Sequence, residues 1–447
     1  MNFDISITIK FIYNMRLFLS RYSFTFYRHG KYLLYNSINN VFYEINQPLY
    51  EYLTQEVITS ESDDNHTIQQ LINEHILVHS ASEDDAYYDA AKGQFLISSF
   101  NTSHIGLTIA PTVRCNLKCP YCFEENKPAG TMSENTINNL IKFIRDHKCA
   151  STYSIAWFGG EPLLSPNIIQ SILVKTKDIE HLKLTHHSIV TNGTLINDEV
   201  INLFIEYPLT DIQITLDGNR THHNEKRFTT TGQGTFDLIL NNIDKSIYKW
   251  DNTKFSIRIN IDKSNMNDYC EMRDMIKQRY SNCNNISIYP GILRANKGCE
   301  SEVFFSSKDH VEFNRMLNDG STTGRRYPSH CSKGCTATNA SSYVIGPKGE
   351  IYLCWEHIGM QEKIVGNIDQ PALSNPTLFY RFLTHGSLFD DIQCKQCGLL
   401  PICNGGCPNK RIENIFEKTN HNLCALYNEN DKDILYDTLY DYFLSKL

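Results

Sequence analysis

Three cysteines in a CxxxCxxC array are the most chemically specific feature of this sequence. Cys115, Cys119 and Cys122 lie within TVRCNLKCPYCFEEN, directly after an apolar segment. Thiolates bind soft metals, and a structural zinc site normally closes with four ligands. The loop contains no fourth Cys or His, so we expect a metal cluster with one open corner. A zinc knuckle and buried structural thiols are the alternatives.

A 4Fe–4S cluster fits a set of three thiolates. Three irons would each take one cysteine, and the fourth iron would be left to bind a substrate or cofactor directly. Catalytic metal sites commonly keep such an open position. The missing fourth thiolate would therefore leave a working site, whereas four thiolates would close it.

The last third of the chain, from about residue 325, contains a second concentration of cysteine. Its segment CKQCGLLPICNGGCPNK is rich in Gly and Pro and reads mostly as loop. A region so poor in regular apolar pattern is expected to depend on metal for its fold. The cysteines of this region are Cys331, Cys335, Cys354, Cys394, Cys397, Cys403, Cys407 and Cys424.

Alternating strand and helix patterns surround the cysteine loop. Residues 105–292 contain β-rich runs separated by amphipathic stretches, which predict a parallel sheet, either doubly wound or a partial barrel. The runs are IGLTIAPT, YSIAWFGG, HSIVTNG, DIQITLDG, FSIRINID and NISIYPGI. Function in such sheets lies at the carboxyl ends of the strands. Those ends carry the cysteine loop, GGEP, TNG and TLDG, so we expect these four motifs to converge on one site.

The first 100 residues form a different pattern. FTFYRHGKYLLYNSINNVFYEI reads as three strands separated by turns, and the two apolar-periodic stretches after it read as helices. We predict a small winged-helix-like module. The polar, acidic segment SASEDDAYYDAAKGQ is expected to be a linker.

Composition narrows the possible partners and the compartment. The 447 residues carry a formal net charge of −8 with no dense Lys/Arg block, so we expect no nucleic-acid partner. No apolar run is long enough to span a membrane, and the first 26 residues lack a cleavage site of the secretory kind. We therefore expect a cytoplasmic protein in which cysteines hold metal rather than form disulfides.

The loop motif, the aromatic Tyr121 before its third cysteine, GGEP and the six (β/α) units together resemble the radical S-adenosylmethionine (SAM) superfamily. The resemblance implies a partial (β/α)6 barrel in which SAM chelates the open iron of a cluster held by Cys115, Cys119 and Cys122. It also implies reductive cleavage of SAM to a 5'-deoxyadenosyl radical, with electrons from a donor such as a flavodoxin or ferredoxin. The residues it implies as SAM contacts are Tyr121, Gly159, Gly160, Glu161, Asn192, Thr215 and Arg227. Taken singly, GGEP could be a simple turn and Asp217 could merely cap the next helix.

The C-terminal cysteines resemble a SPASM domain, which carries two auxiliary 4Fe–4S clusters in that family. The first ligand set implied is Cys335, Cys354 and Cys407, with Cys331 as the candidate fourth ligand. The second set implied is Cys394, Cys397, Cys403 and Cys424. Two zinc sites would satisfy the same thiolates and are the alternative. The resemblance thus divides the chain into a recognition module at 1–100, a radical SAM core at 101–325 and a SPASM domain at 326–447.

The substrate implied by this combination is a peptide. SPASM domains in relatives accompany peptide or protein maturation, and residues 1–100 resemble the element that binds leaders of ribosomally made precursor peptides. We expect a side-chain cross-link, carbon–carbon, ether or thioether, although related enzymes can epimerise residues instead. The alternatives are an anaerobic sulfatase maturase that makes formylglycine, and a non-catalytic zinc- and peptide-binding protein. The sequence identifies no catalytic acid or base.

Overall fold

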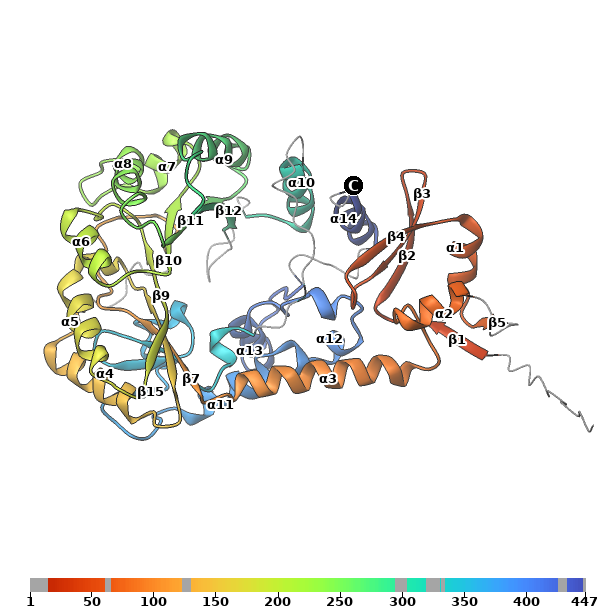
Figure 1. Ribbon diagram of the computed structural model, residues 1–447, viewed down its shortest axis with the longest axis horizontal. Coiled ribbons are helices and arrows are strands. Elements are labelled where there is room, and N and C mark those ends of the chain that lie inside the picture. Colours follow the sequence, from red (N-terminus) through yellow and green to blue (C-terminus); the bar gives the residue numbers. More distant parts are fainter. Residues whose placement is uncertain are drawn as a thin grey trace, which may run out of the picture.

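The computed structural model describes residues 15–60, 66–122, 130–293, 304–318, 330, 334–424 and 432–444. Figure 1 shows a sheet wrapped by helices at one end, a smaller β-rich module at the other, and the C-terminal region between them. Helix α3 (Ala81–Ser99) runs along the molecule between the two ends. Among the described residues, no helix combines the length and the apolar character needed to cross a membrane.

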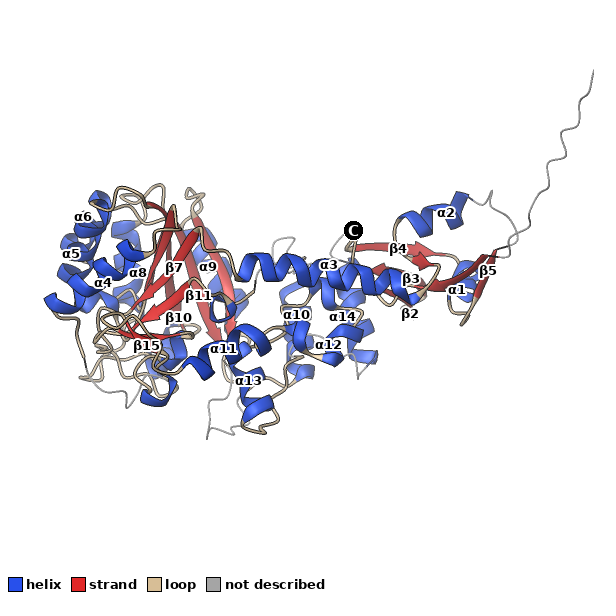
Figure 2. Cartoon of the chain, turned by 90° about the horizontal axis from the view of Figure 1, so that it is seen from below, coloured by secondary structure: helices blue, strands red, loops and turns tan. Residues whose placement is uncertain are grey.

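Parallel strands in chain order form the centre of the sheet, in the order β12-β11-β10-β9-β8-β7. They are β7 (His104–Ile109), β8 (Thr152–Trp157), β9 (Lys183–Thr191), β10 (Asp211–Leu216), β11 (Lys254–Ile261) and β12 (Ile286–Ile292). The connecting helices are α4 (Glu134–Asp146), α5 (Pro166–Lys177), α6 (Asp198–Glu206), α7 (Arg220–Lys226), α8 (Phe236–Ser246) and α9 (Asp268–Arg279). Helices α4, α5, α6 and α8 cover the outer face (Figures 1 and 2). The predicted α/β fold with a parallel sheet, a partial (β/α)6 barrel, is confirmed.

Alternation along the strands decides which side chains face the helices. In β10, Ile212 and Ile214 are fully buried against the helical layer, and the alternate residues Gln213 and Thr215 lie on the opposite face. Ile257 repeats the pattern in β11. The apolar positions therefore build the core, while the inner face of the sheet is left polar.

The N-terminal module contains two small sheets. Strands β2 (Ser23–Arg28), β3 (Lys31–Asn36) and β4 (Val41–Ile45) form an antiparallel sheet, as predicted. A second sheet, unexpected from the sequence, joins β5 (Ile58–Ser60), β1 (Met15–Leu19) and β6 (Leu77–Val78). The two predicted helices are α1 (Gln47–Leu53) and α2 (His66–Asn73). The prediction of a small β-rich module with helices is confirmed.

The segment expected to be a linker is instead part of helix α3. Its first turn carries Glu83 and Asp84, which favours a helix N-terminus electrostatically. Asp84 is buried and accepts hydrogen bonds from the Ser20 hydroxyl at 2.7 Å and the Arg21 backbone N–H at 2.8 Å. Because these partners are distant in sequence, the local polar composition gave no sign that the segment packs.

The C-terminal region contributes three strands to the barrel sheet. Strand β13 (Ser342–Ile345) pairs in parallel with β7, and β14 (Glu350–Tyr352) and β15 (Gly366–Asn367) continue a nine-stranded sheet. Its helices, together with the one that follows β12, are α10 (Ser307–Asn318), α11 (Pro376–His385), α12 (Ile392–Gln396), α13 (Pro408–Phe416) and α14 (Lys432–Leu444). Short 3-10 helices lie at Pro162–Leu164, Thr336–Thr338, Trp355–His357, Gln361–Lys363, Leu388–Asp390 and Leu400–Ile402.

Candidate functional site

The cysteine loop follows β7, and backbone hydrogen bonds join it to another segment and fix a turn within it. The Lys118 N–H donates to the Phe228 carbonyl at 2.9 Å, and the Cys122 N–H donates to the Cys119 carbonyl at 3.0 Å. The Leu117 N–H points at the Cys115 sulfur at 3.5 Å. These hydrogen bonds hold the backbone of the loop in place. The three thiols lie close enough for Cys119 and Cys122 to affect the pKa of Cys115.

Burial makes these thiols weak acids in the metal-free chain. Although part of Cys115 is open to solvent, desolvation of its thiol raises its pKa to about 12, and the thiols of Cys119 and Cys122 add to that rise. Desolvation likewise raises the pKa of Cys119 to about 11, although Arg227 works in the opposite direction. A metal that binds here would displace thiol protons, so its binding should strengthen as pH rises.

The glycines of GGEP, which follow β8, lie in close contact with the backbone at the start of the cysteine loop. Gly159 has a φ of +121°, and a Cβ there would lie 2.3 Å from the Thr112 carbonyl oxygen. A Cβ on Gly160 would lie 2.4 Å from the Arg114 carbonyl oxygen. The Glu161 N–H donates to that same Arg114 oxygen at 2.9 Å. Only glycine permits this approach, so GGEP is more than a simple turn.

Glu161 turns its carboxylate into the protein. The side chain is fully buried and accepts hydrogen bonds from the Leu163 N–H at 3.0 Å, the Thr191 hydroxyl at 2.7 Å and the Asn192 N–H at 2.7 Å. Burial raises the pKa of Glu161, and these donors oppose the rise. Its carboxylate thus fastens the end of β8 to the end of β9.

Asn192 brings the TNG motif to the cysteine loop. Its side-chain amide donates to the Asn116 side-chain oxygen at 2.9 Å and approaches the Cys115 sulfur at 3.9 Å. Asn116 in turn donates to the Thr194 hydroxyl at 2.9 Å. Sequence reasoning missed Asn116, although its position between Cys115 and Cys119 was a usable signal.

A buried polar network joins the loop to the next two strands. Arg227 donates to the Tyr121 hydroxyl at 3.0 Å and lies 3.7 Å from the Asp217 carboxylate. Asn260 of β11 donates to the same hydroxyl at 3.2 Å and to Asp217 at 3.1 Å. In the described part of the chain, Asp217 Oδ2 and Arg227 Nε have no hydrogen-bond partner. Such orphaned buried atoms indicate room for a further polar group.

Opposing effects act on the charges of this network. Burial works against the charge of Arg227, but neighbouring Tyr121 and Asp217 raise its pKa overall. Burial raises the pKa of Asp217, with Arg227 opposing. Asp217 does not cap α7, since that helix is capped by Asn219, whose side chain accepts from the Thr221 and His222 N–H groups. Asp217 and Asn260 were both missed as site residues because their partners come from other strands.

Thr215 lies beside this network on the inner face of the sheet. It is paired in register with Arg258 of β11, and it is 8% exposed. Arg258 donates from Nε to the Asn260 side-chain oxygen at 2.9 Å. The structure therefore brings six of the predicted residues to the cysteine loop, namely Tyr121, Gly159, Gly160, Glu161, Asn192 and Arg227. Thr215 lies on β10, two residues before Asp217 of the network.

Cys335, Cys354 and Cys407 form one neighbourhood of C-terminal cysteines whose thiols influence one another. The thiols of Cys335 and Cys354 are desolvated, which raises the pKa of each, and Cys407 adds to both rises. Cys331 lies outside the described residues, so its predicted role stays a prediction. Among the described residues, no three His, Cys, Asp or Glu side chains are grouped as for a single metal ion.

The second neighbourhood contains Cys394 and Cys403. Desolvation raises the pKa of Cys394 to about 11, and Cys403 adds to the rise, whereas Arg411 lowers it. The Gly405 N–H donates to the Cys403 sulfur at 3.3 Å. Sulfur atoms that accept N–H bonds are typical of thiolates that hold iron–sulfur clusters.

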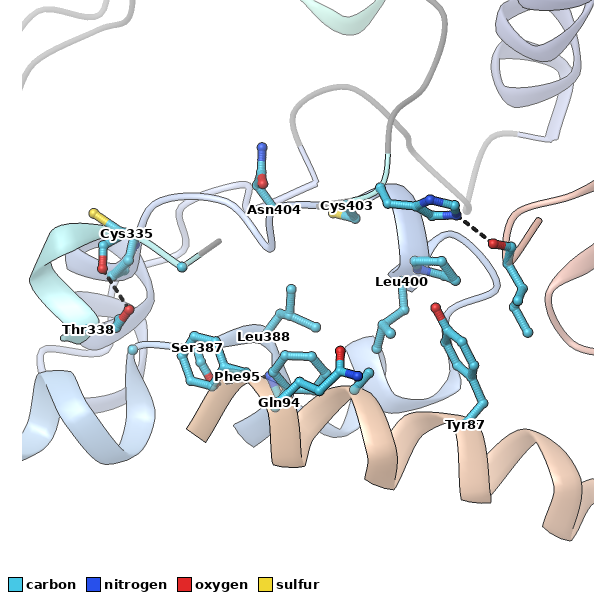
Figure 3. A pocket seen from close by; sticks show the side chains of 18 residues that line it. Tyr87, Gln94, Phe95, Cys335, Thr338, Ser387, Leu388, Leu400, Cys403 and Asn404 are labelled. Atoms are coloured by element: carbon cyan, nitrogen blue, oxygen red, sulfur yellow. Dashed lines mark hydrogen bonds between the residues drawn. The ribbon is translucent and has the colours of Figure 1, made fainter. Parts of the chain in front are cut away.

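A pocket of about 260 Å³ lies between α3 and the C-terminal loops. Figure 3 shows Tyr87, Gln94 and Phe95 of α3 along one side, with Cys335 and Cys403 at separate points of the wall. The pocket thus touches one predicted ligand from each of the two C-terminal cysteine sets.

Comparisons with known proteins place the central sheet in a family. Residues 109–276 match the family model described as the Radical SAM superfamily. The chain is 25% identical over 341 residues to a cysteine-type anaerobic sulfatase-maturating enzyme of Clostridium novyi (strain NT), covering 69% of this chain and 89% of that protein.

One further relative and one solved structure are similar over more of the chain. The radical SAM cyclopropyl synthase TigE of Paramaledivibacter caminithermalis is 22% identical over 440 residues, covering 88% of this chain and 89% of that protein. The crystal structure of Streptococcus suis SuiB bound to precursor peptide SuiA superposes with a TM-score of 0.52 at 16% identity, covering 88% of this chain and 96% of that one. The matched residues contain the cysteine loop, GGEP, TNG and TLDG, and this part of the chain is therefore identified with the radical SAM superfamily.

Proposed function

We propose that this chain modifies a ribosomally made precursor peptide by radical chemistry begun at the cysteine loop. Membership of the superfamily implies SAM and one 4Fe–4S cluster. When bound, they supply a 5'-deoxyadenosyl radical that removes hydrogen from an unreactive C–H bond. The chain itself binds, orients and shields the reactants.

Cys115, Cys119 and Cys122 are the proposed cluster ligands. The donor set fits, because the three thiols lie on one loop and the Cys115 sulfur has both the Leu117 N–H and the Asn192 amide beside it. N–H donors stabilise a thiolate over a thiol. The one free position that such a set leaves is where SAM would bind.

The proposed SAM contacts surround that loop. Glu161 has both carboxylate oxygens occupied by protein groups, so the backbone of the GGEP segment is the part that could receive the SAM amino group. Arg227 keeps an unpartnered Nε among the described residues, which supports its assignment to the SAM carboxylate. Tyr121 would lie against the adenine, and Asn192 and Thr215 would face the ribose or methionine portion.

The C-terminal cysteines are proposed to hold two auxiliary 4Fe–4S clusters. The first would use Cys335, Cys354 and Cys407, with Cys331 as the candidate fourth ligand. The second would use Cys394, Cys397, Cys403 and Cys424. This division is supported by the thiols that raise one another's pKa. Cys407 does so for Cys335 and Cys354, and Cys403 does so for Cys394. A flavodoxin or ferredoxin is the proposed source of electrons.

The observation that carries the peptide proposal is the β-rich module attached to the radical SAM core. Strand β4 is an outer strand of its sheet, paired with β3 along one edge in the described chain. An extended leader could add as a further strand at the other edge, where main-chain hydrogen bonds provide affinity. SuiB, which is similar over 88% of this chain, was solved with a precursor peptide bound.

A second candidate is sulfatase maturation. The identity of 25% to a sulfatase-maturating enzyme favours it, but that match covers 69% of this chain, against 88% for TigE. A non-catalytic zinc- and peptide-binding protein is the third candidate, and the complete cysteine loop with GGEP weighs against it.

Co-expression with a short peptide encoded beside the gene, followed by mass spectrometry, tests the proposal. A loss of two hydrogens per event supports a cross-link, and an unchanged mass with an inverted residue supports epimerisation. A product that reacts with a hydrazide would reveal formylglycine and favour the second candidate. A peptide unchanged in mass and configuration would contradict peptide modification.

A further inference from the structure

A single arginine is buried whole among the C-terminal cysteines. Arg411 of α13 is 2% exposed and is among the largest fully buried side chains of the described chain. A guanidinium does not lose its proton in proteins, so it needs anionic partners when it leaves water. Its position therefore requires negative charge nearby.

The contacts of Arg411 reach two other segments of the chain. Its Nη1 donates to the Asp391 carboxylate, and its Nη2 donates to the Gly405 carbonyl at 2.6 Å and to the Cys394 sulfur at 3.7 Å. Among the described residues, its Nε has no partner. Arg411 thus links α13 to the start of α12 and to the loop between Cys403 and Cys407.

The backbone around Arg411 is built to allow this arrangement. Gly405 has a φ of +74°, and a Cβ there would lie 2.4 Å from the Leu388 Cβ. Asp391 also caps α12 by accepting from the Gln393 and Cys394 N–H groups. One carboxylate therefore orients both the helix that carries Cys394 and the guanidinium that touches its sulfur.

We propose that Arg411 is the positioning and charge-compensating residue of the second auxiliary cluster, and that its charge raises the reduction potential of that cluster. The inference rests on the proposed function, because it assumes that Cys394, Cys397, Cys403 and Cys424 hold iron and sulfide. Asp391 pairs with Nη1 of Arg411, whereas Nη2 faces the Cys394 sulfur, where the proposed cluster would lie.

The sign of the effect follows from Coulomb's law. Reduction adds one electron and one negative charge to the cluster, and no protein bond forms or breaks. A buried cation near a ligand sulfur favours the more negative form, and it does so more strongly than a solvated cation. Nearby charge and N–H bonds to sulfur are known to change the reduction potentials of iron–sulfur clusters.

The test uses the full chain carrying Cys115→Ala, Cys119→Ala and Cys122→Ala, so that only the auxiliary clusters remain. Each midpoint potential is measured by electron paramagnetic resonance during anaerobic titration, with dithionite as the one-electron source. In Arg411→Gln, the reduced-to-oxidised ratio of one cluster at fixed potential should fall at least tenfold, which is about 59 mV for a one-electron couple. In Asp391→Asn, which keeps a helix-capping side chain, the same potential should move in the opposite direction.

Lys410→Gln is the matched control, because it removes a positive charge from the neighbouring, partly exposed position of the same helix. Its potentials should stay at the parent values. If Arg411→Gln loses one cluster, that loss supports the positioning role, and Asp391→Asn then decides the sign. Unshifted potentials in both variants with full iron content would overturn this inference alone. Zinc in place of iron in the parent would overturn the auxiliary-cluster proposal as well.

Discussion

At the scale of single residues, the site depends on a carboxylate that faces away from it. Glu161 receives three hydrogen bonds from groups of β9 and of the turn after β8, while its own N–H reaches the cysteine loop. A buried carboxylate with all its donors in place fixes geometry tightly, because each donor would be costly to leave unpaired. Glu161 therefore sets the spacing of two strand ends.

Glu161→Gln should weaken both the fold and the cysteine loop. The new amide group would turn N–H toward the N–H or hydroxyl donors that the carboxylate now serves, and an unpaired buried donor costs about 1–3 kcal/mol. We expect a lower melting temperature and less iron per chain, measured by anaerobic calorimetry and iron analysis. Glu180→Gln, at an exposed position, is the control. Equal melting and iron content in the two variants would show that the Glu161 contacts are dispensable.

The same variant carries a pH signature. Because burial raises the folded-state pKa of Glu161 above its ordinary value of 4.5, folding favours its protonated form. Its contribution to the free energy of unfolding is thus largest below that value and is lost as pH rises through the raised pKa. The free energy of unfolding of the wild type minus that of Glu161→Gln should therefore fall as pH rises from 4.5 through the raised pKa, as measured by denaturant unfolding at a series of pH values.

The sequence identified the parts of the site that carry a local signal. Gly159 was predictable because a glycine pair after an apolar strand marks close backbone approach, and the three cysteines were predictable from spacing. Asn116, Asp217 and Asn260 were not, because their roles arise from partners on distant strands. Asp217 in particular, followed by glycine, resembled an ordinary cap.

At the scale of elements, helix α14 ties the N-terminal module to the C-terminal region. Leu435, Leu439 and Phe443 pack in one buried cluster with Phe26 of β2 and Leu33 of β3. Arg28 of β2 adds ion pairs to Asp433 and Asp437 of the helix. These contacts hold the sheet that includes β4, the proposed leader-binding edge.

Leu439→Ala should loosen this attachment. Leu439 is fully buried, and truncating a buried leucine to alanine costs about 2–5 kcal/mol. We expect faster amide hydrogen exchange in residues 23–45, while the strands of the barrel keep their protection. Leu238→Ala, at a leucine that is 45% exposed, should leave exchange unchanged. If residues 23–45 exchanged at the wild-type rate in Leu439→Ala, α14 would not be their anchor.

The elements themselves were predicted unevenly from the sequence. The barrel strands followed from alternation and the glycines at their ends, since both are local properties. Helix α3 was missed because its packing partners, such as the Ser20 hydroxyl on Asp84, lie far away in the chain. The pairing of β13 with β7 likewise joins segments more than two hundred residues apart.

At the scale of the whole molecule, packing contacts connect the N-terminal module to the barrel through the C-terminal region. The N-terminal sheet contacts α14, α14 contacts α10, and α10 follows directly after the barrel strands. Figure 2 shows α3 running beside the C-terminal helices between the module and the barrel. A peptide held by the module would therefore be tethered to the same chain that carries the cysteine loop, which raises its effective concentration there.

The most direct test of the central claim is the yield of 5'-deoxyadenosine from SAM under anaerobic reduction. The reconstituted wild-type chain should cleave SAM, and Cys119→Ala should yield no 5'-deoxyadenosine, because one cluster ligand is lost. Cys149→Ala, at an exposed cysteine outside the loop, should match the wild type. Cleavage by Cys119→Ala at the wild-type rate would contradict the assignment of the radical site to Cys115, Cys119 and Cys122.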